Sequence, residues 1–136
     1  MSADAFLDTC VVAYAFVEGD VRQERSLEIL ADGGTISVQV LNELANICRR
    51  KLALDWAGTE GALEAVKVCC PRPVPLTQAV HEAGVRLARR YGFSVYDGLI
   101  LAAAVDAGCT TLLTEDLQHG QVVEGVRIEN PFHSTR

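Results

Sequence analysis

The sequence predicts an α/β fold: a three-layer sandwich in which a central parallel sheet carries helices on both faces. Short apolar or β-branched segments alternate along the chain with longer segments of helical periodicity, which indicates parallel strands joined by crossover helices. Hydrophobic residues make up 49% of the 136 positions, enough for a sizeable core, and the length suits a single domain over residues 1–136. In such sheets ligands bind beyond the carboxyl ends of the strands.

In the first half of the chain, turn and cap residues separate the predicted elements from one another. We expect a strand at residues 5–7, a helix from 9 to about 17, a helix at 22–31, a strand at 35–37 and helices at 38–54 and 56–68. Gly33 and Gly34 end the second helix, since glycine is a poor helix former. Gly58 and Gly61 weaken the last helix of this half for the same reason.

In the second half, the expected elements are a strand at residues 74–76, helices at 77–90 and 94–108, and strands at 110–114 and 126–128. Thr77 is a suitable N-cap for the first of these helices, and Gly92 ends it. The segment SVYDGLILAAAVDAG is apolar nearly all round, which is typical of a buried helix. The segment TTLLT is rich in β-branched and apolar residues, which favours a strand.

Composition excludes several classes of protein. The net charge of −6 argues against general electrostatic attraction to nucleic acid, although a local acidic pocket that holds cations remains compatible with it. No apolar run reaches the roughly 18 residues of a membrane helix, and the acidic N-terminus lacks the basic region of a signal peptide, so we expect a cytoplasmic protein with no membrane partner. The five cysteines contain no C-x-x-C pair; we interpret them as small buried hydrophobes and do not expect zinc.

Four acidic residues occupy positions near strand ends or helix starts. Asp8 follows the first strand between two apolar segments, where a carboxylate without partners is costly to bury. Asp116 follows the strand TTLLT, and its neighbour Glu115 is expected to point away from it. Glu43 lies early in the helix after the second strand, and Asp97 lies in the first turn of the buried helix. Taken singly, Glu43 is better explained as a solvated helix acid and Asp97 as a capping residue after Ser94, and Asp116 has the alternative of a turn residue.

A shared pocket would give these four acids one purpose. Two carboxylates about 4 Å apart repel by roughly 4 kcal/mol at an effective dielectric near 20, so such a cluster requires protons or cations. Oxygen ligands without histidine or cysteine suit Mg²⁺ or Mn²⁺. Metal-assisted hydrolysis of a phosphodiester is the chemistry that fits this donor set.

Four segments in order carry a family resemblance: FLDTCVVAYAF, SVQVLNELANICRRKL, YGFSVYDGLILAAAVDAGC and TLLTEDLQHGQVVEGVRIENPF. Together they resemble PIN-domain proteins, specifically the VapC-type ribonuclease toxins of bacterial type II toxin–antitoxin pairs, over essentially the whole chain. The resemblance implies a parallel sheet of about five strands. It also implies a Mg²⁺- or Mn²⁺-dependent endoribonuclease whose catalytic and metal-binding residues are Asp8, Glu43, Asp97 and Asp116.

Three further residues are candidates for contact with the RNA substrate. Thr9 matches the family's Ser/Thr after the first acid, and Thr114 matches the Ser/Thr two residues before the last acid, where it would hold a water or phosphate. Cys10 departs from the family's polar residue at that position. Arg50 lies about two helical turns from Glu43 on nearly the same face, and its alternative is an ordinary solvated helix end.

The resemblance also implies partners. One is a cognate antitoxin of the VapB type whose C-terminal segment fills the groove over the acids, and the other is a second copy of the chain in a homodimer or a toxin–antitoxin hetero-oligomer. The sequence contains more apolar positions than one small core needs, among them Leu27, Leu30, Val40, Leu44 and Trp56. A non-catalytic PIN-like module that binds RNA or protein is the alternative to the nuclease, and the four intact acids argue against it.

Overall fold

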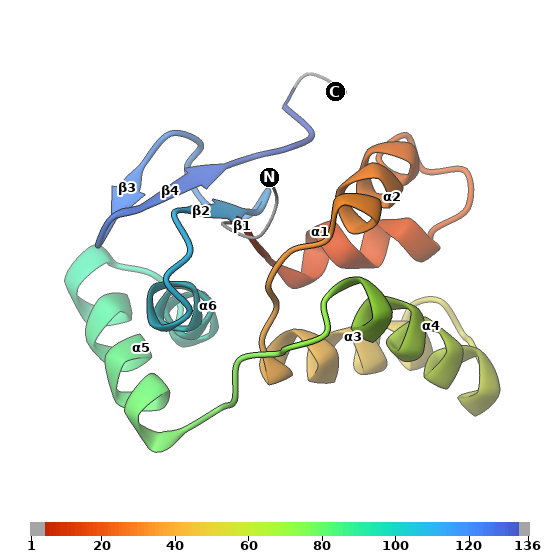
Figure 1. The fold of residues 1–136 in the computed structure, drawn as a ribbon, viewed down its shortest axis with the longest axis horizontal. Helices are drawn as coiled ribbons and strands as arrows, with labels where there is room; N and C mark the ends of the chain where they lie inside the picture. The colour runs from red at the N-terminus through yellow and green to blue at the C-terminus, as the bar shows by residue number, and fades with distance from the viewer. Residues whose placement is uncertain (1–4, 134–136) are drawn as a thin grey trace.

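The structure is a computed structural model of the chain, and it describes residues 5–133. Its helices are α1 (Thr9–Ala13), the 3₁₀ helix η2 (Tyr14–Phe16), α2 (Gln23–Asp32), α3 (Val38–Arg50), α4 (Trp56–Cys69), α5 (Gln78–Tyr91) and α6 (Val95–Asp106). Its strands are β1 (Ala5–Leu7), β2 (Thr111–Leu113), β3 (Val122–Val123) and β4 (Val126–Glu129). The α/β class of the fold is therefore confirmed (Figure 1).

The described residues form one sheet of four strands in the order β1-β2-β4-β3. β1 pairs with β2 and β2 with β4 in parallel, whereas β3 pairs with β4 antiparallel. The predicted all-parallel sheet is therefore wrong for its β3 edge, and the expected number of about five strands is not confirmed. The antiparallel edge comes from a two-residue hairpin at Glu124 and Gly125, both with positive φ, which is the geometry of a type I′ turn.

Two of the predicted strands are present only as isolated β-bridges. Residues 35–37 and 74–76 follow the sheet direction through parallel bridges between Phe6 and Thr35 and between Ser37 and Val74. Prolines flank Val74 on both sides, and proline has no N–H to donate to a ladder. The prolines that bound this predicted strand therefore also prevent a regular ladder of hydrogen bonds along it.

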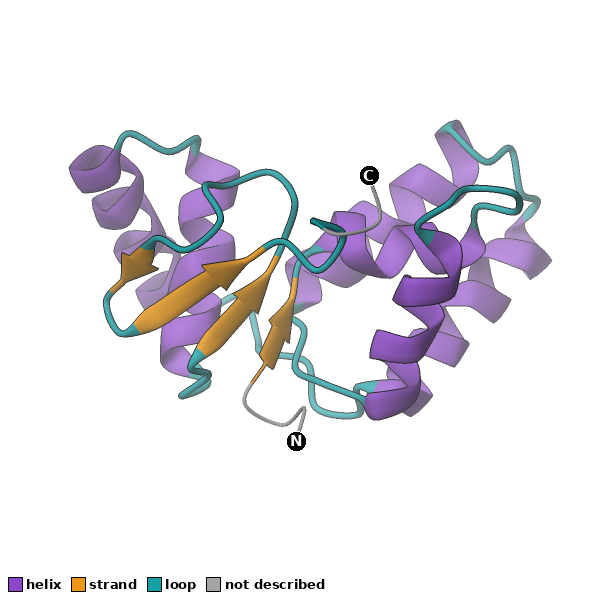
Figure 2. Cartoon of the chain, turned by 90° about the horizontal axis from the view of Figure 1, so that it is seen from above, coloured by secondary structure: helices purple, strands orange, loops and turns teal. Residues whose placement is uncertain are grey.

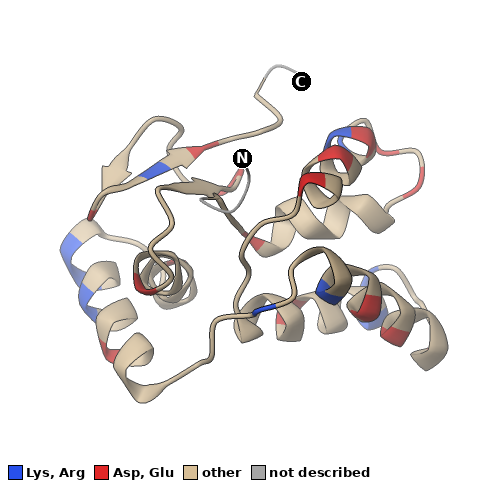
Figure 3. Ribbon diagram, in the orientation of Figure 1, with Lys and Arg blue, Asp and Glu red and all other residues tan. Residues whose placement is uncertain are grey.

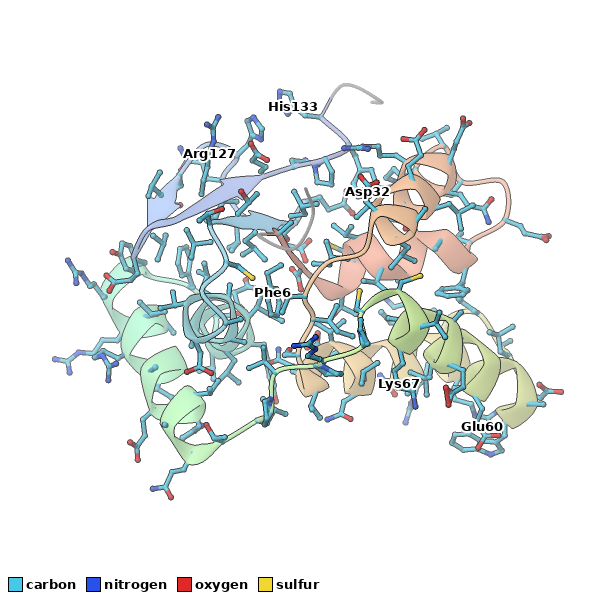
Figure 4. The ribbon with its side chains drawn as sticks, viewed as in Figure 1. Phe6, Asp32, Glu60, Lys67, Arg127 and His133 are labelled. Atoms are coloured by element: carbon cyan, nitrogen blue, oxygen red, sulfur yellow. The ribbon has the colours of Figure 1, made fainter. Side chains whose placement is uncertain are left out.

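Burial along the strands shows how far helices cover the sheet. Phe6 and Leu7 are neighbours in β1, so their side chains point to opposite faces, and both are fully buried. In β4, Val126 and Ile128 are buried while Arg127, which points outward in Figure 4, is exposed. Both faces of the sheet are therefore buried at β1, whereas one face is exposed at β4.

The helices form two groups around the sheet (Figures 1 and 2). The pair α5 and α6 lies together, with α6 against β2 and β4, and α1 to α4 lie beyond β1. Glycines allow α5 and α6 to approach closely, since an added Cβ at Gly98 would lie 2.3 Å from the Gly84 carbonyl oxygen. No helix within residues 5–133 is long and apolar enough to cross a membrane.

Side-chain caps set where the helices begin. Ser37 accepts a hydrogen bond from the Val40 N–H at 3.4 Å, and Ser94 accepts one from the Asp97 N–H at 3.1 Å. Two predicted helices are too long. The segment from residue 9 to 17 tightens into η2 after Ala13, and α3 stops at Arg50 ahead of the predicted residue 54, in a turn where Ala53 has a φ of 54°.

Candidate functional site

The four predicted acids line one cleft of about 700 Å³. Asp8 comes from the end of β1, Glu43 from α3, Asp97 from the first turn of α6, and Asp116 from the loop after β2. Figure 3 marks acidic positions in red at the start of α1 and along α3 and α6, which border the cleft. The predicted convergence of acids that are remote in sequence is therefore present, while their role as metal ligands stays a prediction.

Asp8 is the buried member of the four, with 5% of its surface exposed. It caps α1, because its Oδ1 accepts a hydrogen bond from the Thr9 N–H at 2.7 Å. Its Oδ2 accepts one from the Thr114 hydroxyl at 2.8 Å. Burial raises the pKa of Asp8 from 3.8 to about 6, the charges of Asp116 and Asp97 add to the rise, and the hydrogen bonds from Thr114 and Thr9 oppose it.

Thr114 ties Asp8 to the loop that carries Asp116. Its hydroxyl donates to Asp8 and accepts from the Asp116 N–H at 3.1 Å, and the residue is fully buried. Thr114 does not line the cleft. Its hydroxyl contacts two of the acids, which it orients, and its contact with a water or phosphate stays a prediction.

Cys10 joins the acids at the same point. Its Sγ and one oxygen each of Asp8 and Asp116 all lie within 4.8 Å of one another. The interpretation of every cysteine as a buried hydrophobe is therefore wrong for this half-buried residue, which lines the cleft. Burial and the charge of Asp8 raise the pKa of the Cys10 thiol.

Glu43 is held through both of its oxygens. Its Oε1 accepts a hydrogen bond from the Thr9 hydroxyl at 2.5 Å, and its Oε2 accepts one from Gln39 Nε2 at 3.2 Å. Thr9, predicted as a substrate contact, lines the cleft but uses its hydroxyl on Glu43. Across the cleft, burial together with the charges of Asp116 and Glu43 raises the pKa of Asp97, and its hydrogen bond with Ser94 opposes the rise.

The structure adds cleft residues that the sequence pattern did not single out. Glu115 lines the same cleft as Asp116, but its carboxylate contacts other residues than Asp116 does. Its carboxylate accepts a hydrogen bond from the Tyr14 hydroxyl and pairs with Arg22 at 3.3 Å. The Arg22 guanidinium also lies 4.0 Å from the centre of the Tyr14 ring. The apolar run that contains Tyr14 gave no sign that its hydroxyl would reach an acid about 100 residues away.

Arg50 is not brought to the acids. It lines a neighbouring recess of about 530 Å³ together with Ala45, Asn46, Arg49 and Trp56. Asn46 lines both the recess and the acid cleft, so the two lie side by side at this residue. Among the described residues, Lys51, which follows Arg50 in the chain, is the basic side chain that lines the acid cleft.

Replacing Thr114 with valine is expected to weaken divalent-cation binding at neutral pH. Valine has nearly the same shape but removes the hydroxyl donor to Asp8 and the acceptor for the Asp116 N–H, so the pKa of Asp8 rises further. Losing these buried contacts also costs about 1–3 kcal/mol of stability. Calorimetric titration with Mn²⁺ at pH 7 measures the affinity. Thr114→Ser keeps the hydroxyl and serves as the control, and equal affinity in both variants would contradict the role of Thr114.

Comparisons with known proteins agree with this architecture. The PIN domain family model matches residues 5–124. The VapC20 toxin of Mycobacterium tuberculosis, described as a sarcin–ricin loop cleaving toxin, is similar in structure with a TM-score of 0.68 at 20% identity, over 88% of this chain and 97% of that chain. VapBC2 from Rickettsia felis, bound to a DNA fragment from its promoter, gives a TM-score of 0.64 at 20% identity, over 93% and 97%. No curated protein sequence matches the chain.

Proposed function

The chain belongs to the PIN domain family, and we propose that it is a metal-dependent endoribonuclease of the VapC toxin type. The observation that carries this proposal is the convergence of Asp8, Glu43, Asp97 and Asp116 on one cleft, although they come from four separate parts of the fold. The alternative is a non-catalytic module that binds RNA or protein. It does not explain why four acids lie together although burial and mutual repulsion make this arrangement unfavourable.

The residues fit a divalent cation that prefers oxygen ligands. Five carboxylates line the cleft, and one of them, Glu115, pairs with Arg22. Among residues 5–133 no histidine lines it, and burial raises the pKa of its one thiol. We propose that Asp8, Glu43, Asp97 and Asp116 hold Mg²⁺ or Mn²⁺. A divalent cation in such a site supplies activation of water and stabilisation of charge that develops on a phosphodiester.

The protein's own part is to hold the acids and to shape the cleft. Thr114 and Thr9 orient Asp8 and Glu43 through their hydroxyls, so these carboxylates need little reorganisation to receive a cation. Ile47 and Ile100 supply apolar wall, which lowers the local dielectric and strengthens attraction between the acids and a cation. Lys51 provides a positive charge at the cleft for the substrate phosphate.

We propose that RNA leaves the acid cleft past Asn46 and enters the neighbouring recess. Arg49 and Arg50 are its charged lining residues, and neither forms an ion pair within residues 5–133. Arg49 lies over the ring of Trp56 at 4.3 Å, yet 63% of Trp56 remains exposed. Guanidinium and indole surfaces bind phosphates and stack on bases, so the recess suits a nucleotide beside the scissile bond. Thr9 donates its hydroxyl proton to Glu43, so its proposed contact with the substrate is as an acceptor.

Reversing the charge of Arg50 is expected to weaken RNA binding while leaving cation binding unchanged. Arg50→Glu removes one phosphate contact and adds repulsion, so KM rises about tenfold and the salt dependence of binding falls by about one ion. Cleavage of a labelled RNA at several salt concentrations measures both effects. Arg86→Glu on α5, in the other helix group, makes the same charge change at another exposed arginine; an equal loss in the two variants would remove Arg50 from the RNA path.

The experiment that tests the proposed function is RNA cleavage by the purified chain. Cleavage should require added Mg²⁺ or Mn²⁺, stop in chelator and disappear in Asp8→Asn. Equal activity of the wild type and Asp8→Asn would point to a contaminating nuclease and would sink the proposal. Binding of RNA by the wild type without cleavage at any divalent cation concentration would favour the non-catalytic alternative.

We propose a VapB-type antitoxin and a second copy of the chain as protein partners. Leu30, Val40 and Leu44 belong to the core, whereas Leu27 and Trp56 are 50% and 63% exposed. Leu27 does not line the recess proposed for RNA, so it remains available for a protein interface. Growth arrest on expression that is lost with Asp97→Ala is the result expected of a toxin.

A further inference from the structure

One buried side chain connects two of the elements that carry acids. Gln39 lies in the first turn of α3, is 5% exposed and lines the acid cleft. Its Nε2 donates to Glu43 Oε2 at 3.2 Å and to the backbone carbonyl of Tyr96, also at 3.2 Å. Tyr96 precedes Asp97 in the first turn of α6. The Gln39 amide thus contacts the carboxylate of one acid and the backbone next to another.

These two acceptors determine how the amide is oriented. The Glu43 carboxylate and the Tyr96 carbonyl both accept hydrogen bonds, so the NH₂ group must face them and its two N–H donors are both used. A flipped amide would place Oε1 against two acceptors. Since the Thr9 hydroxyl holds the other oxygen of Glu43, this carboxylate is fixed from α1 on one side and by Gln39 on the other.

The same orientation carries a penalty. Gln39 Oε1 is buried and has no hydrogen-bond partner among the described residues. A buried amide oxygen left in this way costs about 1–3 kcal/mol. An apolar side chain of similar length would fill the space without this penalty, so packing does not explain why an amide stands here. Its two N–H donors are what an apolar residue would lack.

We infer that Gln39 is a positioning residue that holds the Glu43 carboxylate and the first turn of α6 at a fixed separation, and so sets the affinity of the cleft for a divalent cation. The inference rests on the proposed function, because it assumes that Glu43 and Asp97 bind the same cation or neighbouring cations. Gln39 acts through Glu43 and the α6 backbone. Side chains that orient metal ligands in this way typically contribute 10- to 100-fold to metal affinity.

The test separates positioning from packing by measuring metal affinity and stability in the same variant. Gln39→Met removes both N–H donors and the unpartnered oxygen but keeps the length of the side chain. We expect its Mn²⁺ affinity, measured by calorimetry, to fall about tenfold or more. Its melting temperature in chelator should change little, because the gain from removing the unpartnered acceptor offsets the loss of the two hydrogen bonds to Glu43 and Tyr96.

The chain offers a matched control at the start of α5. Gln78 donates from Nε2 to Glu82 Oε2 at 3.0 Å, the same glutamine–glutamate pair four residues apart, but this pair is exposed and away from the cleft. Gln78→Met should leave Mn²⁺ affinity unchanged. Wild-type affinity in Gln39→Met would overturn the inference.

A fall in melting temperature that accompanies the loss of affinity in Gln39→Met would also overturn the inference, since it would mark Gln39 as a packing residue. If Gln39→Met does not fold, the measurement is repeated with Gln39→Leu, which has a smaller side chain. Failure of both variants to fold would also mark Gln39 as a packing residue and overturn the inference. Failure of the proposed function is distinguishable, because the wild type itself would then bind no Mn²⁺ and cleave no RNA.

Discussion

Replacing Gly98 with alanine is expected to lower the free energy of unfolding by about 3 kcal/mol, a loss of roughly 10 °C in Tm for a chain of this size. The added Cβ would lie 2.3 Å from the Gly84 carbonyl oxygen and 3.0 Å from the Ala88 side chain. The obstacle is backbone of α5, which cannot rotate away as a side chain can. The helical preference of alanine over glycine returns at most about 1 kcal/mol, so the steric term dominates.

The same change should disturb the cleft, because Gly98 follows Asp97 in the first turn of α6. Separating α6 from α5 would move Asp97, and cation affinity should fall together with stability. Gly61→Ala is the matched control: Gly61 lies inside α4, and nothing lies within 4 Å of its added Cβ. That variant should gain up to about 1 kcal/mol. Thermal unfolding of both variants measures the contrast, and a Gly98→Ala protein as stable as the wild type would contradict the close packing of α5 and α6.

Local signals in the sequence located most helices to within one or two residues. Thr77 and Gly92 bound α5, and Ser94 caps α6, because side-chain caps and left-handed glycines act within a few residues of one another. The hairpin between β3 and β4 was missed for the opposite reason. Its turn is Glu124-Gly125 in place of the Asn-Gly or Asp-Gly that marks such turns, and the positive φ of Glu124 depends on the surrounding fold. Its carboxylate accepts a hydrogen bond from Tyr91, which lies 33 residues away.

The candidate site was only partly predictable for the same physical reason. The acids could be named because the family resemblance selected Glu43 and Asp97 together with Asp8 and Asp116, which follow strands. Their supporting contacts join residues far apart in sequence: Thr114 with Asp8 over 106 positions and Gln39 with Tyr96 over 57. No periodicity or local motif encodes such pairs. Cys10 entered the site and Arg50 did not, because the direction of a side chain at a helix end depends on packing that the sequence pattern does not specify.

Replacing Asp8 with asparagine is expected to reduce metal-dependent RNA cleavage by more than about 100-fold and, in chelator at pH 7, to make the protein more stable. Both effects come from the same burial. The pKa of Asp8 rises from 3.8 in the unfolded chain to about 6 in the fold, so the folded state holds a proton that the unfolded state has already released between these values. Stability from this group is therefore complete below pH 3.8 and is lost as the pH rises through 6.

At about 1.4 kcal/mol per pH unit, this loss amounts to about 3 kcal/mol in the metal-free wild type at neutral pH. Asparagine carries no charge to bury, keeps an acceptor for the Thr9 N–H, and can donate to the Thr114 hydroxyl. The stability advantage of the variant should therefore be near zero at pH 4 and grow to about 3 kcal/mol by pH 7. Added Mg²⁺ or Mn²⁺ should stabilise the wild type and reduce that advantage, because a cation compensates the buried charge.

Denaturation in chelator from pH 4 to 8 measures this difference, and a matched control is available on α4. Asp55 also caps a helix and also accepts a backbone N–H at 2.7 Å, from Gly58, but it is exposed to water. Asp55→Asn makes the same chemical change without releasing a buried charge, and asparagine caps helices as well as aspartate does. Its stability should therefore follow that of the wild type across this range. An Asp8→Asn protein that is less stable than the wild type at pH 7 in chelator would show that burial of the Asp8 carboxylate costs no stability. An Asp8→Asn protein that cleaves RNA as fast as the wild type would show that the cleavage does not depend on this site.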